Sequence, residues 1–531
     1  MTILSVKSAA CLMQMVTTLP GIQTDSSVYR MKCPSTANSD VDVLLTADRT
    51  LMSNYHGNEF LGFGTCAPPN FIPDILYSYL FFPPIKTNNG LPVAAPYGLR
   101  KIEAQLLKEG FNVLTVSPKH LGKYVKSAKV VGIHTMDPFG FGPASTTLAS
   151  IFKKEPFLAR HFYALINNPS NREAKKNGLK VIVGGPGAWQ FRYRPQLIKE
   201  KAIDCVVEGE AENVIGKIVR AAVEGEELPA HYEVAAKDAP RLEDIPDILQ
   251  PSVNGLIEIG RGCCRGCEFC NVTLRPLRWY PLDKIVRELS VNVELGKNRV
   301  ICLHAEDVML YGSQNAVPDD EKLLRLHDLV KSKVPAVSWS HCSLAAVASK
   351  PTLFSILSEI ILQKQTWWGA EVGIETGSAR LAKKIMPAKA LPFKAEDWPQ
   401  VVQQGLGLMH DNMLVPAGTL IVGLPEETED DILRTMELMD DVKDCRSLIV
   451  PLFFVPLGRL KDENWFSRAE MSPLHKQLLF QCAEHSLRWA DNLIELSFID
   501  EGYRRVLKEF YKVFAGIVKR QIRQAEITEL K

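Results

Sequence analysis

Four of the chain's twelve cysteines lie within eight residues, at Cys263, Cys264, Cys267 and Cys270. So tight a group is typical of a metal site rather than of a disulfide framework. Three thiolates spaced as C-x₃-C-x₂-C can ligate three irons of a [4Fe–4S] cluster and leave the fourth iron open. A zinc knot or a fully ligated cluster needs a fourth Cys or His at metal spacing, and only the adjacent Cys264 is at hand. The sequence therefore predicts an open iron–sulfur site.

The charge and apolar pattern argue against two classes of partner. Lys plus Arg number 62 and Asp plus Glu 61, for a net charge of +1, so no electrostatic partner such as duplex DNA is indicated. The longest apolar stretch, 448–457, contains prolines and is shorter than the roughly 20 residues that cross a bilayer. The N-terminus matches a signal peptide poorly. We expect a cytoplasmic protein without a nucleic-acid or membrane partner.

The chain of 531 residues is long enough for several domains, and its pattern predicts an α/β fold. Residues 1–90 are rich in Thr, Asn, Pro and Gly and predict an extension that wraps the next domain, with one strand at 41–45. Residues 91–228 alternate strands and helices, as in a Rossmann-like parallel sheet. A proline-rich linker is expected at 229–251.

A second series of strands and helices occupies residues 252–460. Strands are predicted at 255–260, 299–304, 336–340, 369–375, 418–422 and 447–455. Six such units fit a partial, open (βα)₆ barrel better than a closed eight-fold barrel. Residues 461–531 predict a helical C-terminal region, with the clearest helices at 473–493 and 503–524, the second of them basic and packed on the barrel.

The cysteine motif and the polar strand ends fall where such folds keep their ligands. Gly260 to Cys270 follows the first barrel strand, and parallel sheets bind ligands at the carboxyl ends of their strands. The ends of the first sheet carry Met136-Asp137, Gly184-Gly185-Pro186 and Glu208-Gly209. Glycines at such ends allow the backbone close to a ligand, because no Cβ stands in the way.

With Phe269 before the last cysteine, the cysteine motif resembles the signature of radical S-adenosylmethionine (SAM) enzymes, and the resemblance extends over about 250–460. It implies that Cys263, Cys267 and Cys270 ligate the cluster. Glu306, in His304-Ala305-Glu306, stands where the family usually has Gly-Gly-Glu and would hold the SAM amino group, although two of the three positions depart. Glu375 and Ser378 would reach the ribose and carboxylate of SAM, and Gly423 would lie against its adenine.

The preceding domain resembles the cobalamin-binding domain of the cobalamin-dependent radical SAM methyltransferases. The motifs 181–186 and 206–212 carry this resemblance, which implies that Met136, Asp137, Gly184, Gly185, Pro186, Glu208 and Gly209 face the cofactor. The Asp-x-His-x-x-Gly motif for a histidine under cobalt is absent. The resemblance therefore implies base-off cobalamin without a histidine ligand, and neither His56 nor His134 is assigned to cobalt.

The two resemblances together imply a C-methyltransferase. A 5′-deoxyadenosyl radical would remove hydrogen from an unactivated sp³ carbon, methylcobalamin would supply the methyl group, and a second SAM would remethylate cob(I)alamin. The segments 95–101 and 135–140 resemble anaerobe and methanogen members. One of these modifies a glutamine of methyl-coenzyme M reductase. The expected partners are therefore a protein substrate, the alpha subunit of that reductase, and a low-potential electron donor.

Three other hypotheses stay open from the sequence. The chain could act on a small molecule, with or without methyl transfer. It could instead catalyse a ring contraction or cyclisation with the same cofactors, which would yield 5′-deoxyadenosine without S-adenosylhomocysteine. A sensor or corrinoid carrier would bind cobalamin without cleaving SAM, although a carrier has no use for an open iron.

Overall fold

The computed structural model describes residues 41–68, 73–497 and 503–529. Residues 40–531 form one compact unit. The first 40 residues of the expected extension lie outside the described residues. In the part of the chain that is described, no helix is both long and apolar enough to cross a membrane.

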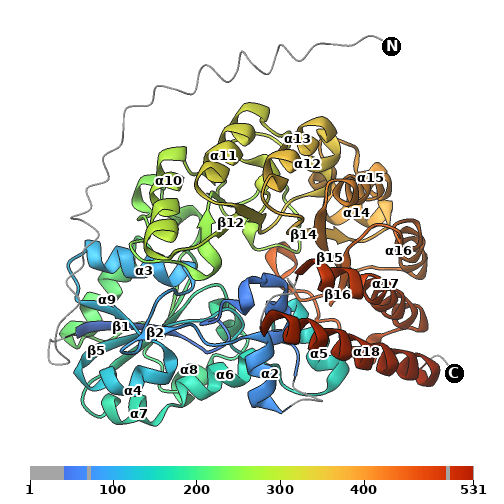
Figure 1. Ribbon diagram of the computed structural model, residues 1–531. Coiled ribbons are helices and arrows are strands. Elements are labelled where there is room, and N and C mark those ends of the chain that lie inside the picture. The colour runs from blue at the N-terminus through green and yellow to red at the C-terminus, as the bar shows by residue number, and fades with distance from the viewer. Residues whose placement is uncertain (1–40, 69–72, 498–502, 530–531) are drawn as a thin grey trace, which may run out of the picture. The chain divides into compact units, whose positions relative to one another are not determined.

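The N-terminal half of the unit is built on a six-stranded parallel sheet (Figure 1), in the order β4-β1-β5-β6-β7-β8. The strands are β1 (Val41–Ala47), β4 (Val113–Thr115), β5 (Ala128–His134), β6 (Lys180–Gly184), β7 (Cys205–Glu208) and β8 (His231–Glu233). Alternate side chains of one strand face opposite sides, so Val130 and Val131 of β5 belong to two separate cores. The predicted Rossmann-like sheet is confirmed.

Helices cover both faces of this sheet. α3 (Tyr97–Lys108) and α9 (Ile215–Glu224) bury leucines and isoleucines on one face. The other face is covered by α4 (Leu121–Tyr124), α6 (Phe157–Ile166), α7 (Pro169–Lys175) and α8 (Gln196–Glu200). A sheet buried on both faces explains why its strands read as nearly continuous apolar runs.

The sheet extends beyond the boundaries expected from sequence. β1 lies inside the expected extension 1–90, yet it pairs with both β4 and β5 and is an inner strand. β8 lies inside the expected linker 229–251 and forms the far edge beside β7. Strand pairing joins residues far apart in the chain, so composition alone placed these two boundaries wrongly.

The second half is the partial barrel. Its strands are β9 (Leu256–Glu258), β12 (Val300–His304), β13 (Ala336–Trp339), β14 (Trp368–Glu375), β15 (Leu414–Val422) and β16 (Leu448–Phe453). They pair in parallel as β9-β12-β13 and β14-β15-β16. A parallel bridge between His341 and Glu371 joins the two groups. All six predicted strands and the (βα)₆ architecture are confirmed.

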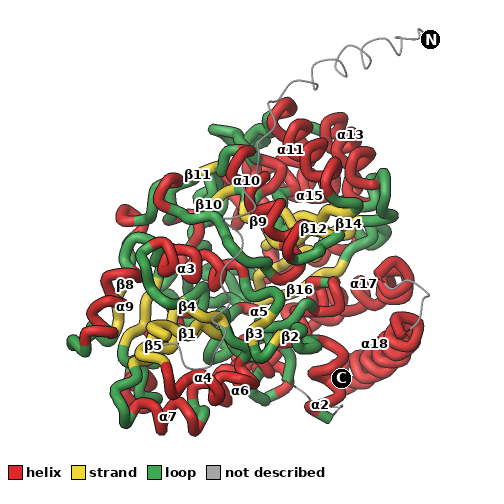
Figure 2. The backbone as a smooth tube through the Cα atoms, turned by 60° about the vertical axis from the view of Figure 1, so that its left-hand side comes forward, coloured by secondary structure: helices red, strands yellow, loops and turns green. Residues whose placement is uncertain are grey.

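The barrel helices lie outside the strands, as Figure 2 shows for α10 and α11. They are α10 (Leu282–Ser290), α11 (Asp320–Lys333), α12 (Leu344–Ser349), α13 (Pro351–Leu362), α14 (Ala379–Ile385), α15 (Trp398–Asp411) and α16 (Glu429–Asp441). Their apolar faces and the outward side chains of the strands form the largest core, which includes Trp339, Trp368 and Trp398. The inward side chains are left free to form a site.

Two long helices end the chain, α17 (Pro473–Ser497) and α18 (Tyr503–Glu529), and run beside each other in Figure 1. The prediction that the basic α18 packs on the barrel is wrong. Its Leu507 and Tyr511 join an aromatic core with α2 (Asp74–Phe81), and the Tyr511 hydroxyl donates to Leu80 O over 2.5 Å. α18 therefore ties the C-terminus to the N-terminal half.

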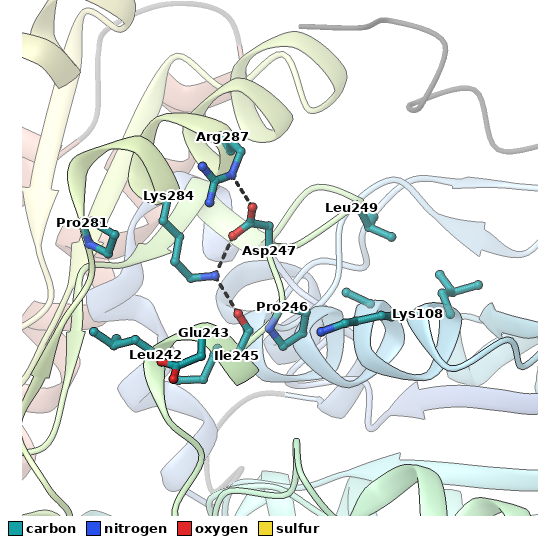
Figure 3. Close-up of a pocket in the computed structure, with 12 residues that line it drawn as sticks. Lys108, Leu242, Glu243, Ile245, Pro246, Asp247, Leu249, Pro281, Lys284 and Arg287 are labelled. Carbon is teal, nitrogen blue, oxygen red and sulfur yellow. Dashed lines mark hydrogen bonds and ion pairs between the residues drawn. The ribbon is translucent and has the colours of Figure 1, made fainter. Parts of the chain in front are cut away.

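A linker crosses between the two halves and is held by charges from α10 (Figure 3). Lys284 Nζ lies 2.6 Å from an Asp247 carboxylate oxygen and donates to Ile245 O over 2.8 Å, while Arg287 pairs with the same carboxylate. A pocket of about 690 Å³ lies at this junction. Lys284, Arg287 and Asp247 on its wall pair with one another, so the pocket is part of the interdomain seam.

Candidate functional site

The cysteine loop lies between β9 and β12, at the carboxyl end of the barrel. Gly262 and Gly266 have φ values of +82° and +65°, which only glycine adopts without strain, so they permit the loop's two sharp turns. Gly458 packs against the loop from the segment after β16, where an added Cβ would lie 2.4 Å from Glu268 O. Glycines on both sides thus set the path of the loop.

The three motif thiols face the same region. Cys267 is buried, Cys263 and Cys270 are partly buried, and the extra Cys264 is exposed. Burial raises the pKa of Cys263 to about 12 and that of Cys267 to about 11, so the thiols are protonated without metal. Iron would displace those protons, because the thiolate is the ligand.

Among the described residues, no three His, Cys, Asp or Glu side chains converge as they would around a single ion. A four-iron cluster makes a different demand, since each thiolate binds its own iron. Cys263, Cys267 and Cys270 come from one loop, Cys267 interacts electrostatically with both Cys263 and Cys270, and Cys264 is the exposed member of the group. This donor set fits such a cluster with one iron open.

The residues expected to hold SAM lie beside these thiols. Glu306, just after β12, is within electrostatic range of Cys270. Glu375 ends β14 with a φ of +64° and pairs with Lys389, whose ammonium is 2.7 Å from Glu375 Oε1. Lys389 also lies within electrostatic range of Cys267 and Cys270. The structure therefore gathers Glu306, Glu375 and Lys389 next to the cluster loop.

Two of the residues expected to contact SAM make contacts within the protein instead. Ser378 is buried, caps α14 by accepting from Leu381 N, and donates to Asp431 over 2.5 Å. Gly423 has a φ of +79° and lies under the ring of Phe466, where a Cβ would be 2.0 Å from that ring. Ser378 and Gly423 thus shape the strand ends through contacts inside the protein.

Glycines after β6 and β7 form a cradle at the edge of the first sheet. Gly185 has a φ of +104°, and an added Cβ would lie 2.6 Å from Thr135 O. Gly209 has a φ of +103° and a similar approach, 2.6 Å, to Val234 O. Gly184, Gly185, Pro186, Glu208 and Gly209 all line one large cavity. The backbone is therefore exposed to the cavity where a corrin is expected, and the cradle fits a large planar ligand.

The charged and apolar side chains near the cradle have distinct positions. Met136 is exposed on the cavity wall, whereas Asp137 is buried and accepts from Gly142 N and from the Gln190 side-chain amide. The Glu208 carboxylate is held by Arg192 at 2.7 Å and by His231 at 3.0 Å. Asp137 and Glu208 thus fix loop shape, while Met136 offers an apolar surface to the cavity.

The two halves meet through Arg261, which begins the cysteine loop. Its guanidinium lies 2.9 Å from Glu210, 2.7 Å from Glu212 and 2.8 Å from Glu258. Burial opposes ionisation of Glu258, but Arg261 holds the pKa of that carboxyl at about 2. Glu210 directly follows Gly209 and Glu212 lies two residues further on, so this cluster joins the corrin cradle to the iron–sulfur loop.

One cavity of about 1,750 Å³ connects these parts. On the side of the first sheet it is lined by the cradle described above. On the barrel side its wall includes Glu258, His304, Glu306, Glu371 and Gly458. Parallel strands from both halves therefore direct their carboxyl ends toward one space large enough for more than one organic cofactor.

A polar layer lies deeper in the barrel. His341 Nε2 is 3.1 Å from Glu371 Oε2, and the His304 ring centroid is 5.9 Å from that of His341. Glu59 enters this layer from the short helix η2 (Glu59–Cys66), where it accepts from the Cys302 thiol at 3.4 Å. The next residue, Phe60, stacks on Trp367 and packs against Gly369. Part of the expected extension thus contributes to the barrel interior.

Sequence patterns did not predict Glu59, Lys389 or the His341–Glu371 pair. None of them belongs to a motif, and their approach depends on tertiary packing. Arg261 lies inside the cysteine motif. A charged residue next to a predicted buried metal site needs carboxylate partners, and this could have indicated its role. Trp367 and Trp368 both border the cavity, and Trp368 is also part of the buried core.

Residues 257–439 match the family model described as the Radical SAM superfamily. That segment holds the cysteine loop and barrel strands β12 to β15, together with most of β9. The barrel of this chain is therefore similar to the radical SAM domain over most of its length.

Solved structures extend the likeness across both halves. TsrM from Kitasatospora setae, a radical S-adenosylmethionine methyltransferase with cobalamin and [4Fe-4S] cluster bound, matches with a TM-score of 0.51 at 15% identity, covering 80% of this chain and 77% of that one. The same enzyme with tryptophan substrate and aza-SAM matches with a TM-score of 0.50 at 16% identity, covering 78% and 73%. At this identity the likeness shows a shared fold.

The curated relatives match only part of this chain and only part of their own length. A tRNA-2-methylthio-N(6)-dimethylallyladenosine synthase from Orientia tsutsugamushi is 23% identical over 52% of this chain and 59% of its own length. An uncharacterized methyltransferase from Pyrococcus horikoshii is 22% identical over 65% of this chain and 77% of its own length. The chain spans about three fifths of the length of the first curated relatives that it matches.

Proposed function

We propose that this chain is a cobalamin-dependent radical SAM methyltransferase acting on an unactivated sp³ carbon. The observation that carries the proposal is the single cavity of about 1,750 Å³, which the glycine cradle lines together with Glu306 and with Arg261 at the start of the cysteine loop. TsrM supports it, because that protein has the same fold and was solved with cobalamin and a [4Fe-4S] cluster bound. The similarity to the curated tRNA-2-methylthio-N(6)-dimethylallyladenosine synthase supports only the coarser class of radical SAM enzyme.

Each cofactor has residues that suit it. Cys263, Cys267 and Cys270 would ligate the cluster, and Glu306 would accept hydrogen bonds from the SAM amino group. The exposed backbone at Gly184 and Gly209 would lie against base-off cobalamin. When bound, the cluster supplies an electron to cleave SAM, and cobalamin supplies the methyl group.

The protein's own contribution is placement and exclusion of water. Arg261 is tied to carboxylates from both halves, so it keeps the cluster loop and the cradle in register. The cavity wall is mostly apolar between these points, with Met136 and Phe60 on it. Such a wall protects a reactive carbon centre from solvent.

We propose a glutamine side chain of a protein, the methyl-coenzyme M reductase alpha subunit, as the substrate, together with a low-potential electron donor. The resemblance of segments 95–101 and 135–140 supports this choice. The polar layer supports it as well, because the carboxylates of Glu59 and Glu371 can accept the N–H groups of a primary amide. A small-molecule substrate is the alternative.

Mass spectrometry of an anaerobic reaction tests the substrate. Reconstituted enzyme, cobalamin, reductant and methyl-deuterated SAM would be incubated with the glutamine peptide of the reductase or with a matched peptide carrying alanine there. We expect the deuterated methyl group on the glutamine peptide alone. An unmodified glutamine peptide with SAM cleavage intact would refute the glutamine assignment, and a sulfur-containing adduct would favour methylthiolation.

A further inference from the structure

Arg265 lies between two of the cluster cysteines, and its charged group is buried. The residue is 3% exposed. Its Nη1 donates to Lys389 O over 2.9 Å and to Leu391 O over 2.8 Å. Its Nη2 donates to Ser343 Oγ over 2.6 Å and to Asp307 Oδ2 over 3.2 Å. A guanidinium is buried only where such partners replace water.

These partners come from three different parts of the barrel. Asp307 follows Glu306 after β12, and its other oxygen accepts from Ser343 N over 3.1 Å. Ser343 caps α12 after β13. Lys389 carries the ammonium that pairs with Glu375 at the end of β14. One side chain therefore fastens the cysteine loop to the residues that follow two strands, β12 and β13, and to the backbone that presents Lys389.

The contact with sulfur is direct. The backbone N–H of Arg265 donates to Cys263 Sγ over 3.5 Å. Glycines precede and follow the segment at positions 262 and 266, so the loop backbone has little stiffness of its own. The Arg265 side chain is its anchor. The Asp307 carboxylate lies within electrostatic range of Cys263, and Arg265 neutralises it at 3.2 Å.

We propose that Arg265 is a positioning residue for the iron–sulfur cluster. Its side chain holds Cys263 and Cys267 at the spacing that the cluster needs and makes the cluster easier to reduce. The inference rests on the proposed function in that the three cysteines bind a cluster. A positive charge and an N–H donor beside the sulfurs favour the reduced cluster, which carries one more electron. Removing the guanidinium leaves the Asp307 charge uncompensated and disfavours reduction.

The variants Arg265→Gln, Arg265→Lys and Arg265→Gln with Asp307→Asn separate charge from anchoring. Arg100→Lys is the matched control, because Arg100 is equally buried but lies in α3, where it pairs with Glu103. Iron content, the electron paramagnetic resonance spectrum of the reduced cluster and its midpoint potential would be measured after anaerobic reconstitution. These readouts need no substrate.

We expect Arg265→Gln to shift the midpoint potential to more negative values and to alter the spectrum. The double variant should recover part of that shift, because it removes the Asp307 charge. Arg265→Lys should shift less, since it keeps the charge, and Arg100→Lys should match the wild type. If Arg265→Gln does not fold, Arg265→Lys and the double variant carry the comparison.

Full iron content with the wild-type potential and spectrum in every Arg265 variant would overturn the inference and leave the proposed function standing. Failure of the wild-type chain itself to take up iron would overturn the proposed function, and this inference with it. The two failures are therefore distinguishable.

Discussion

Lys101 of α3 and Glu288 of α10 form an ion pair that is closed to solvent, with side-chain exposures of 1% and 0%. Tyr97 donates to the second oxygen of Glu288 over 2.5 Å, and Lys101 also donates to Pro246 O over 2.7 Å. α3 belongs to the first sheet and α10 to the barrel. The pair is thus a buried bond between the two halves, on whose relative position the shared cavity depends.

Breaking this pair from one side should destabilise the chain strongly. Lys101→Met leaves the Glu288 carboxylate buried without its cation, which typically costs about 3–5 kcal/mol. Chemical denaturation would measure the loss. The double variant Lys101→Met with Glu288→Met should cost less than either single change, because no charge stays unpaired. A loss in the double variant equal to the sum of the two single losses would contradict the pairing.

The cysteine assignment predicts a sharp contrast within the loop. Cys263→Ala, Cys267→Ala or Cys270→Ala should abolish the visible absorbance of the cluster and all SAM cleavage. Cys264→Ala is the matched control, since Cys264 is exposed and outside the three-thiol set. It should keep both the iron content and the cleavage. Loss of the cluster in Cys264→Ala, with retention in one of the others, would refute the assignment.

Two neighbouring glycines of the cradle should respond differently. Gly185→Ala places a Cβ 2.6 Å from Thr135 O at a φ of +104°, so it should lower thermal stability, with backbone strain of about 1–2 kcal/mol plus the clash. Gly184→Leu meets its nearest atom, Val207 O, at 3.4 Å and extends toward the cavity.

Gly184→Leu should therefore fold nearly as well as the wild type yet retain less cobalamin. Cobalamin absorbance after gel filtration, measured beside the melting temperature, separates the two effects. Undiminished cobalamin in Gly184→Leu would place the corrin elsewhere.

The His341–Glu371 pair should make stability depend on pH. Burial disfavours the imidazolium, but the hydrogen bond and charge of Glu371 outweigh burial and raise the pKa of His341 to about 9. A folded-state pKa above the unfolded value of about 6.5 stabilises the fold fully below pH 6.5, and this contribution is lost as pH rises through about 9.

The free energy of unfolding should thus fall between about pH 6 and about pH 10 by more in the wild type than in His341→Gln. Urea denaturation at the two pH values measures the difference. Parallel falls in the two proteins would show that His341 does not hold a raised pKa.

For the proposed glutamine substrate, Glu59 should determine how the side-chain amide binds. Its carboxylate accepts from the Cys302 thiol, a weak donor that an amide N–H can replace. Glu59→Ala should lower kcat/KM for the glutamine peptide by about 10- to 100-fold, as expected for a hydrogen bond to a charged group. Uncoupled SAM cleavage should be unchanged. An unaltered kcat/KM would remove Glu59 from the substrate site.

The strands and the order of the two halves were predictable because buried parallel strands between helices leave a strong local pattern. The cysteine loop was predictable for a similar reason, as its spacing is local. β1 was assigned to an extension and β8 to a linker, because the residues of a strand do not reveal that it pairs with a distant strand, here β5 for β1 and β7 for β8. Arg265 and Lys389 gain their roles only through partners that are distant in the chain and meet them across the barrel.

Ser378 shows that a residue in a recognised motif can also have a structural role that the sequence does not reveal. Its position in the motif predicts a SAM contact, but the same position begins α14, and the backbone N–H groups of a helix start compete for the hydroxyl. Asp431 completes its hydrogen bonding. A motif read from sequence cannot separate a side chain that faces a ligand from one that shapes the strand end.

Mass spectrometry of the cobalamin and nucleosides from a single anaerobic reaction tests the central claim most directly, and it needs no substrate. The reconstituted chain would be incubated with cobalamin, a low-potential reductant and methyl-deuterated SAM, beside Cys263→Ala. We expect deuterated methylcobalamin together with 5′-deoxyadenosine in the wild type, and no 5′-deoxyadenosine in Cys263→Ala. Release of 5′-deoxyadenosine with cobalamin left unmethylated would contradict methyl transfer, and no 5′-deoxyadenosine at all would contradict a radical SAM enzyme.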